Sequence, residues 1–190
     1  MNERPAYIAD MVTQDAMTAE ELYRLNLPDK RTELVAGRLI VREPPGFRHG
    51  RVAAQIALRV GNYVEKHDMG IVLAGDPGFI LQRGPDTVRA PDVAFIFRHR
   101  LPDPEPVAYA ELAPDLAVEV LSPGDRPGET LAKVADWLNA GTRLVWVVDP
   151  GRRQLRVYRA DGTEALLSGG DRLDGEQVVP DFSIDVADIF

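Results

Sequence analysis

The chain has 190 residues, 45% of them hydrophobic, so it is long enough to bury one sizeable core, and nothing in it resembles a long linker. Its 30 acidic residues against 22 lysines and arginines give a net charge of −8, which excludes a broadly basic surface, so any contact with nucleic acid must be local. The absence of cysteine excludes disulfides and thiolate metal sites.

The cellular setting is predicted from what the sequence lacks. The first residues, MNERPAYIADMV, do not combine a basic segment with an apolar stretch of signal-peptide length. No run approaches the ~18 apolar residues of a membrane span. We therefore expect a soluble, cytoplasmic protein with no membrane partner.

A short helix and a hairpin are predicted near the N-terminus. Thr18, with Glu21 three residues later, forms a capping-box pattern, and the helix should end at Pro28. The segment ELVAGRLIV, residues 33–41, contains two short apolar runs about an Ala-Gly pair. It predicts a β-hairpin with Glu33 at its start.

A long helix and several strands should follow. From about His49 to Lys66, apolar residues fall at helical spacing on the side that carries His49, so this histidine should lie on or near the buried face. Residues 71–81 predict two strand pieces about the sequence GDPG. Residues 91–97 predict a strand that opens with a proline and Asp92.

Residues 114–150 are the segment around which the chain is organised. The apolar run 116–121 predicts a strand buried on both faces, although Glu119 interrupts it. A helix should follow, with Asp125 as its N-cap, and then a second buried strand at 144–148. The helix should present an apolar stripe of Leu131, Val134, Ala135 and Leu138. A strand, a crossover helix and a strand in this order predict two parallel strands.

The C-terminal part predicts a second hairpin and a tail. QLRVYRA and TEALLSG should pair about Asp161-Gly162, and the tail VVPDFSIDVADIF should pack along an edge of the sheet. We expect a single domain over residues 1–190, with a helix and hairpin at 18–43, a core at about 49–160 and a C-terminal edge segment at 161–190.

Two carboxylates are candidates for a metal site. A charged, unpaired carboxylate in an apolar strand costs several kcal/mol, so Glu119 must be paired, protonated or bound to a metal. If the strands of Asp92 and Glu119 share one sheet, both side chains can converge on a hard cation such as Mg²⁺. The pattern equally allows Asp92 to cap a turn and Glu119 to pair with an arginine.

Lys133 is the candidate third member of the site. A lysine beside a metal-bound water and a phosphate can orient or help deprotonate the nucleophile, or stabilise developing charge. On a helix, Lys133 lies about 160° from the predicted apolar stripe and on the same side as Trp137. The alternative, a solvated helix lysine, therefore stays open.

These motifs, in their order, resemble those of the large bacterial family of putative restriction endonucleases, the Uma-type domain of the PD-(D/E)XK nuclease superfamily. The segments that carry the resemblance are PDVAFIF, PDLAVEVLSPGDR, the helix with Lys133 and Trp137 before AGTRLVWVVDP, Glu33 with Gly37, His49, and PDFSIDVADIF. The resemblance implies an α/β (α+β) restriction-endonuclease-like fold, with a central mixed sheet flanked by helices. It also implies Mg²⁺ or Mn²⁺ as the cofactor and hydrolysis of phosphodiester bonds in DNA.

The family pattern assigns roles to individual residues. It puts the metal-binding aspartate on Asp92 and the second acidic ligand on Glu119. The superfamily lysine should stand at position 121, where this chain has a leucine, and the resemblance suggests that Lys133 reaches the same place. As accessory residues, Glu33 would add a ligand or hold a metal-bound water, while His49 would contact the metal shell or the phosphate. A core histidine at a helix start is the other interpretation of His49.

Two classes of function follow. The first is a metal-dependent endonuclease acting on DNA. The second is a catalytically lapsed DNA-binding or regulatory protein on the same fold, which the displaced lysine and the acidic balance favour. A homodimer is left open.

Overall fold

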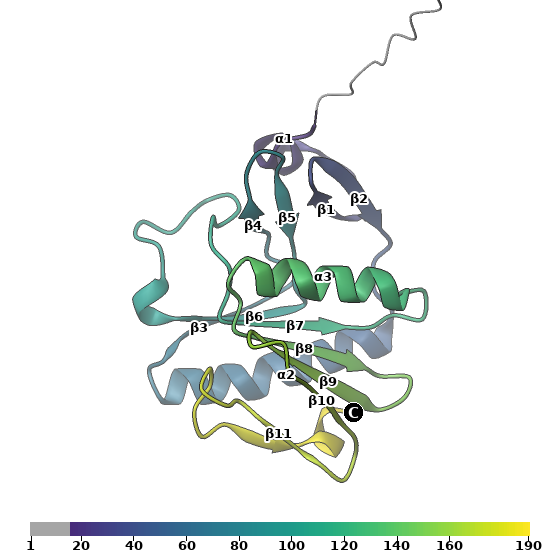
Figure 1. Ribbon diagram of the computed structural model, residues 1–190, viewed down its shortest axis with the longest axis vertical. Helices are drawn as coiled ribbons and strands as arrows, with labels where there is room; N and C mark the ends of the chain where they lie inside the picture. Colours follow the sequence, from purple (N-terminus) through teal and green to yellow (C-terminus); the bar gives the residue numbers. More distant parts are fainter. Residues whose placement is uncertain (1–15) are drawn as a thin grey trace, which may run out of the picture.

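The computed structural model describes residues 16–190 and arranges their strands in three sheets. The N-terminal segment MNERPAYIADMV, on which the expectation of no signal peptide was based, lies outside these residues. A six-stranded sheet forms the centre, a four-stranded sheet stands at one end, and two short strands form the third (Figure 1). In the part of the chain described, no helix has the length and apolarity needed to cross a membrane.

The central sheet is mixed, as predicted. Its order is β10-β9-β8-β7-β6-β3, and only β7 and β8 pair in parallel. Its strands are β3 (Gly70–Ala74), β6 (Val93–Phe97), β7 (Leu116–Val120), β8 (Leu144–Asp149), β9 (Gln154–Arg159) and β10 (Glu164–Leu167). Helix α3 (Pro127–Asn139) connects β7 to β8, which confirms the predicted β-α-β unit. The predicted hairpin of β9 and β10 is confirmed as well.

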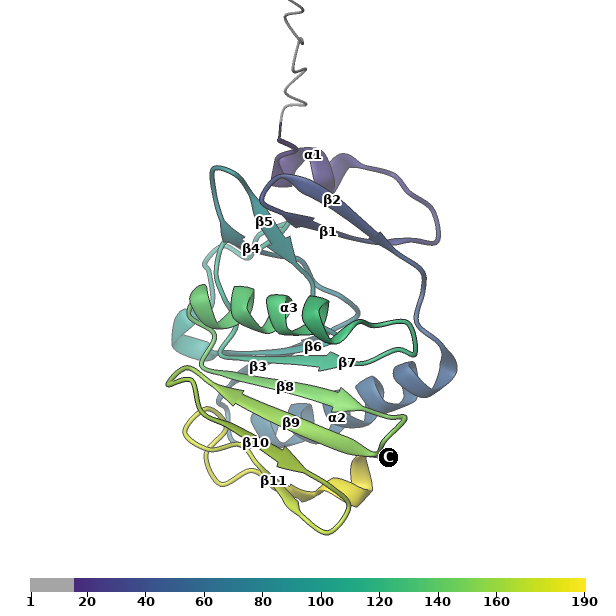
Figure 2. The ribbon, with the colours of Figure 1, turned by 45° about the vertical axis from the view of Figure 1, so that its right-hand side comes forward.

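The small sheet is built around the predicted early hairpin. Its order is β2-β1-β5-β4, with β1 (Arg31–Val35), β2 (Arg38–Arg42), β4 (Phe79–Gln82) and β5 (Thr87–Arg89). Gly37 stands in the hairpin turn at φ +75°, and a Cβ there would lie 2.3 Å from the Cβ of Ala16, so a glycine is required. Helix α1 (Ala19–Arg24) covers this sheet and begins with the predicted capping box of Thr18 and Glu21 (Figure 2). The two strand pieces about GDPG exist, but they belong to different sheets.

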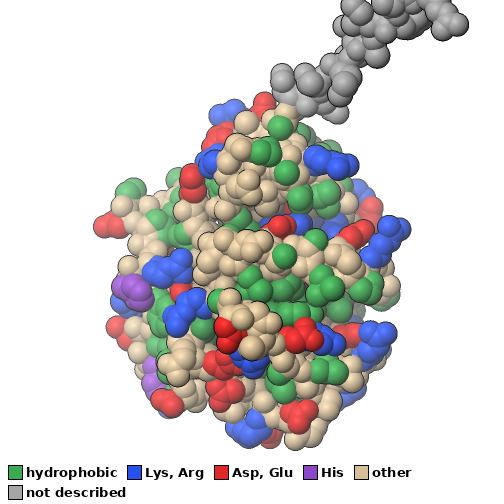
Figure 3. Space-filling model, viewed as in Figure 1, with side chains coloured by type: hydrophobic (Ala, Val, Ile, Leu, Met, Phe, Trp, Pro, Cys, Tyr) green, Lys and Arg blue, Asp and Glu red, His purple; other side chains and the backbone are tan. Residues whose placement is uncertain are grey.

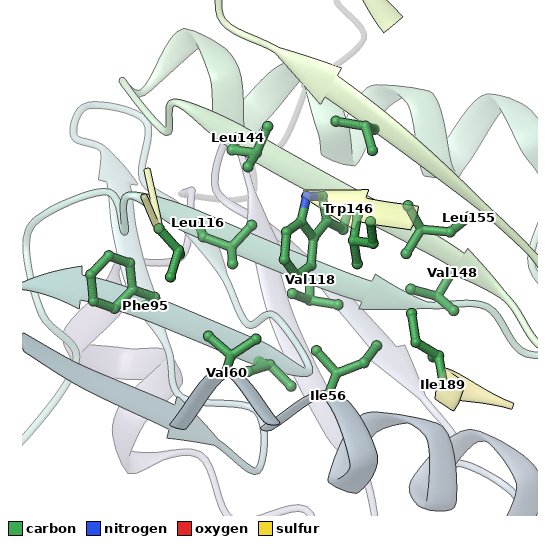
Figure 4. Close-up of a cluster of buried hydrophobic side chains, with 14 of the residues drawn as sticks. Ile56, Val60, Phe95, Leu116, Val118, Leu144, Trp146, Val148, Leu155 and Ile189 are labelled. Carbon is green, nitrogen blue, oxygen red and sulfur yellow. The ribbon is translucent and has the colours of Figure 1, made fainter. Parts of the chain in front are cut away.

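One face of the central sheet is an apolar core. Helix α2 (Phe47–Lys66) packs on it through Val52, Ile56, Val60 and Val64, against side chains that alternate along the strands, such as Val118 and Trp146 (Figure 4). The C-terminal strands β11 (Arg172–Asp174) and β12 (Ser183–Asp185) and the 3₁₀ turn Val186–Ile189 contribute to the same core. The prediction that the tail packs along an edge was wrong, because its large apolar side chains gain more burial on the face.

The opposite face is covered by α3, and two predictions about this helix were wrong. Asp125 is not the N-cap: the helix begins after Arg126, and the Asp125 carboxylate instead accepts from the backbone N–H of Ser122 at 2.8 Å. The predicted stripe is rotated as well, since Leu131 is 52% exposed while Val134 and Trp137 are buried. The helix turns this way because Trp137 and Lys133 both bind a carboxylate in the sheet.

Candidate active site

Asp92 and Glu119 reach one cleft from two neighbouring strands. Asp92 stands immediately before β6 and Glu119 lies within β7, which pairs with β6. Both side chains line a cleft of about 440 Å³, as do His49 and Lys133. The structure therefore brings together four of the five residues that the sequence singled out.

The Asp92 carboxylate is almost completely buried and is held by three donors. Its Oδ2 accepts from the backbone N–H of Val120 at 2.6 Å, while Oδ1 lies 3.1 Å from Arg31 and 3.2 Å from His49 Nε2. Burial raises the pKa of Asp92, but the bond and charge of His49, the Val120 N–H and Arg31 together bring the pKa below its usual range. Asp92 is thus an oriented, ionised group.

The Glu119 carboxylate has one donor on each oxygen, both from α3. Trp137 Nε1 donates to Oε1 at 2.7 Å, and Lys133 Nζ donates to Oε2 at 2.8 Å. Burial raises the pKa of Glu119 to about 7, with Asp92 and Glu33 adding to the rise and Lys133 opposing it. Among residues 16–190 no arginine pairs with this carboxylate, as the alternative interpretation required, and Lys133 and Trp137 bind it instead.

Lys133 lies inside the protein, with its side chain only 14% exposed, so the solvated alternative was wrong. Its amine contacts three oxygen atoms: Glu119 Oε2 at 2.8 Å, Glu33 Oε1 at 2.8 Å and the carbonyl of Ala90 at 2.9 Å. An ammonium group has three N–H donors, so all of them are used. Burial lowers the pKa of Lys133, yet the two carboxylates outweigh it and hold that pKa well above its usual value. Lys133 is a fixed cation.

Glu33 supports Lys133 from the small sheet. Its Oε1 also accepts from the backbone N–H of Ala90 at 2.9 Å, and its Oε2 accepts from Arg89 at 2.9 Å. Arg89 in turn donates to Asp136 of α3 at 2.5 Å and 2.8 Å. Burial raises the pKa of Glu33, but Lys133, Arg89 and the Ala90 N–H lower it to about 2. Glu33 does not line the cleft of Asp92 and Glu119 and lines a neighbouring one instead.

His49 lies in the first turn of α2, where its ring is buried. Its Nε2 faces Asp92, whereas Nδ1 is buried and has no hydrogen-bond partner among residues 16–190. The predicted position on the buried side of the helix is confirmed. The ring and Arg31 both contact Oδ1 of Asp92.

Two basic residues of the site were missed by sequence reasoning. Arg31 and Arg89 lie on β1 and β5 of the small sheet, and both are ordinary arginines in strand segments that carry no motif. Arg31 bridges Asp92 and Asp76, the aspartate of the GDPG sequence, which it approaches to 2.8 Å. The only signal for Arg89 is that it stands three residues before Asp92 in the sequence RAPD.

The donor chemistry of the cleft fits a hard divalent cation. Mg²⁺ is commonly held by one or two carboxylates, with waters and substrate phosphates completing its octahedron. Asp92 and Glu119 supply that number of carboxylates in one cleft. Among residues 16–190 no preformed group of three or more acidic, histidine or cysteine ligands exists, so the remaining ligands would come from water and substrate.

Comparisons with known proteins identify a family and a fold. A family model, Uma2, described as putative restriction endonuclease, matches residues 19–187. The crystal structure of a putative nuclease belonging to DUF820 from Anabaena variabilis superposes with a TM-score of 0.81 at 18% sequence identity, covering 92% of this chain and 97% of that one. At that identity the likeness shows the fold. A search of curated proteins found no match.

Proposed function

The chain belongs to the Uma2 family of putative restriction endonucleases, and we propose that it is a metal-dependent endonuclease that hydrolyses phosphodiester bonds of DNA. One observation carries the proposal: Asp92 and Glu119 line one cleft, and Lys133 reaches Glu119 from the following helix at 2.8 Å. Burying a carboxylate in an apolar strand lowers the stability of the fold, and a role in cation binding explains why Glu119 stands there.

Asp92 and Glu119 are the residues that would hold Mg²⁺ or Mn²⁺. When bound, such an ion supplies an activated water and polarises the phosphate. The protein itself orients the two carboxylates. The Val120 N–H and His49 fix Asp92, and Trp137 fixes Glu119, each through a buried side chain or backbone donor.

Lys133 contributes charge rather than a proton-accepting group. Its amine stays protonated and already donates to three oxygen atoms, so it has no lone pair with which to deprotonate water. A fixed ammonium beside the reacting phosphate stabilises the negative charge that develops as a water oxygen bonds to phosphorus and the P–O bond to the sugar breaks. Of the two roles expected for this lysine, we therefore propose the electrostatic one.

The surface charge agrees with local rather than extended contact with DNA. On the face seen in Figure 3, Lys and Arg side chains are interspersed with Asp and Glu and form no broad basic area. With a net charge of −8, the protein must draw in a phosphate backbone mainly through the cations of the site itself.

The test is cleavage of DNA by purified protein. Supercoiled plasmid should be nicked or linearised with Mg²⁺ or Mn²⁺ and stay intact with EDTA, because without the ion no water is activated. Metal-independent DNA binding, with no cleavage of double-stranded or single-stranded DNA under any of these conditions, would overturn the proposal. That outcome would favour the regulatory alternative, which the tight pairing of Asp92 with Arg31 and His49 also allows.

A further inference from the structure

A second cleft adjoins the first. It has a volume of about 290 Å³ and shares Arg31, Arg42 and Lys133 with the larger cleft. These three cations therefore stand between the two spaces.

The two clefts have opposite charge. Five carboxylates and three Lys or Arg side chains line the first, whereas the second has four Lys or Arg side chains and only two carboxylates. Both of those carboxylates are already paired, Glu33 with Arg89 and Asp76 with Arg31. Two of the chain's three lysines, Lys30 and Lys133, line this one cleft of a protein whose net charge is −8. Arg31 and Arg42 also pair with carboxylates of the first cleft, so a phosphate would meet Lys30 and the guanidinium N–H donors that those pairs leave free.

An aromatic ring forms part of the same wall. Tyr109 is partly buried and lies against Gly78, where an added Cβ would come within 2.1 Å of the ring. Tyr23 packs edge-to-face on it, with ring centroids 5.4 Å apart, so the ring is held in place. A fixed aromatic ring beside a basic wall is the combination that binds a nucleic-acid strand, because it offers stacking to a base and cations to its phosphate.

We propose that the second cleft binds the nucleotide next to the scissile bond, with its phosphate at Lys30, Arg31 and Arg42 and its base at Tyr109. The inference rests on the proposed nuclease function and names the substrate unit that the site takes beyond the reacting phosphate. Lys30 is available for this exchange, since its pair with Glu43 is exposed to solvent and such pairs contribute little. The substrate strand would cross from the acidic cleft into the basic one over Lys133.

The experiment measures binding without turnover. A 5′-fluorescein-labelled thymidine hexanucleotide is titrated with the full chain in EDTA at low salt, with fluorescence anisotropy as the readout. Lys30→Glu should weaken binding about tenfold or more, since it replaces a phosphate-binding cation by a repelling group. The matched control is Lys66→Glu at the end of α2, which changes net charge equally, lines neither cleft and should leave the affinity within about twofold. Tyr109→Leu should weaken binding about tenfold through lost stacking.

Competition identifies what the cleft recognises. Thymidine monophosphate should displace the probe at lower concentration than inorganic phosphate, and thymidine should be weaker than both if the phosphate and the base are each bound. Equal affinities for the wild type, Lys30→Glu and Lys66→Glu, or no binding of the hexanucleotide by the wild type, would overturn the inference. If phosphate and thymidine monophosphate displaced the probe at the same concentration, the cleft would bind only the anion, and the assignment of the base to Tyr109 would be overturned.

The two proposals fail separately. If Lys30-dependent binding is observed but plasmid stays intact with Mg²⁺ and Mn²⁺, the nuclease proposal fails and the nucleotide site stands. If cleavage requires the metal and Lys30→Glu changes neither KM nor kcat, the nuclease proposal stands and the second cleft is not part of the substrate path. With both correct, Lys30→Glu raises KM and leaves kcat near the wild-type value.

Discussion

The two tryptophans lie on opposite faces of the central sheet and show how differently the faces are used. Trp146 of β8 is fully buried in the apolar core beneath α2, and its Nε1 has no hydrogen-bond partner among residues 16–190. Trp137 of α3 is equally buried, but its Nε1 donates to Glu119 at 2.7 Å. Both faces have an apolar cluster, but on the α2 side the buried indole N–H is unsatisfied, whereas on the α3 side it orients the carboxylate of Glu119.

Neighbouring residues of a single strand serve these two purposes. Val118 points into the apolar core, and Glu119 points to the charged side, because successive side chains of a strand alternate. Replacing buried polar groups by apolar ones often stabilises a protein, so the charged side is a cost that the core must offset. The apolar core on the α2 side therefore supplies stability that the buried charges on the α3 side cost. Each prediction below tests one of these two faces.

The largest expected effect is loss of cleavage on the charged side. Asp92→Ala and Glu119→Ala should each abolish Mg²⁺-dependent plasmid cleavage, since either removes a proposed ligand. Glu129→Ala is the matched control, because Glu129 lines the same cleft from an exposed position. Both inactive variants should still unfold cooperatively in a thermal melt followed by circular dichroism. Full activity in either of them would remove that residue from the metal site.

Truncation on the apolar face should give the opposite result. Leu116→Ala should lower the free energy of unfolding by about 3 kcal/mol, since it leaves a cavity beneath α2. Leu166→Ala on the half-exposed edge strand β10 should cost less than about 1 kcal/mol. Urea unfolding measures both. Cleavage per folded molecule should be unchanged at 20 °C, and a specific loss of activity in Leu116→Ala would show that the faces are not separable.

Titration of Glu119 should make stability depend on pH. Its pKa is raised by burial from 4.5 to about 7, so its contribution is fully present below pH 4.5 and is lost as pH rises through 7. Between pH 4.5 and pH 7, the free energy of unfolding of the wild type should therefore fall by about 3 kcal/mol relative to that of Glu119→Gln, whose side chain cannot ionise. Glu33 does not interfere, because its lowered pKa acts below pH 4.5. Parallel urea-unfolding profiles for the two proteins from pH 4.5 to 8 would contradict the prediction.

Lys133→Ala should lower the cleavage rate by roughly 10²-fold, as expected for loss of one fixed charge at the reacting phosphate. Because the lysine acts as a cation, Lys133→Arg should recover part of the rate if the larger group fits between Glu33 and Glu119. Lys66→Ala is the control.

The smallest effect is optical and separates the two tryptophans directly. Mn²⁺ binding at Asp92 and Glu119 should change the emission of Trp137, which touches Glu119, and not that of Trp146 on the far face. Trp146→Phe should therefore retain the metal-dependent change in fluorescence, and Trp137→Phe should lose it. A change that survives in Trp137→Phe would place the ion elsewhere.

Local pattern predicted much of this molecule. The β-α-β unit, both hairpins, the capping box at Thr18 and the buried side of α2 with His49 all follow from periodicity and turn chemistry within short windows of sequence. A buried carboxylate at position 119 was also evident, because its neighbours in the strand are apolar. What the sequence determined by itself was therefore most of the longer elements, though not the short strands β5 and β11, and the buried carboxylate within one of them.

Only the tertiary structure decided where the charges meet. Lys133 lies inside the protein, and not on the solvated side that the alternative allowed, because Glu119, Glu33 and the carbonyl of Ala90 accept its hydrogen bonds. Glu33 and Ala90 do so from segments 43 or more residues away. Arg31 and Arg89 joined the site from strands of a separate sheet, and the tail moved from an edge to a face. Such choices depend on pairing energies in a low-dielectric interior, and apart from the two contacts of α3 with Glu119 the partners are 43 or more residues apart, so no short window of sequence contains both.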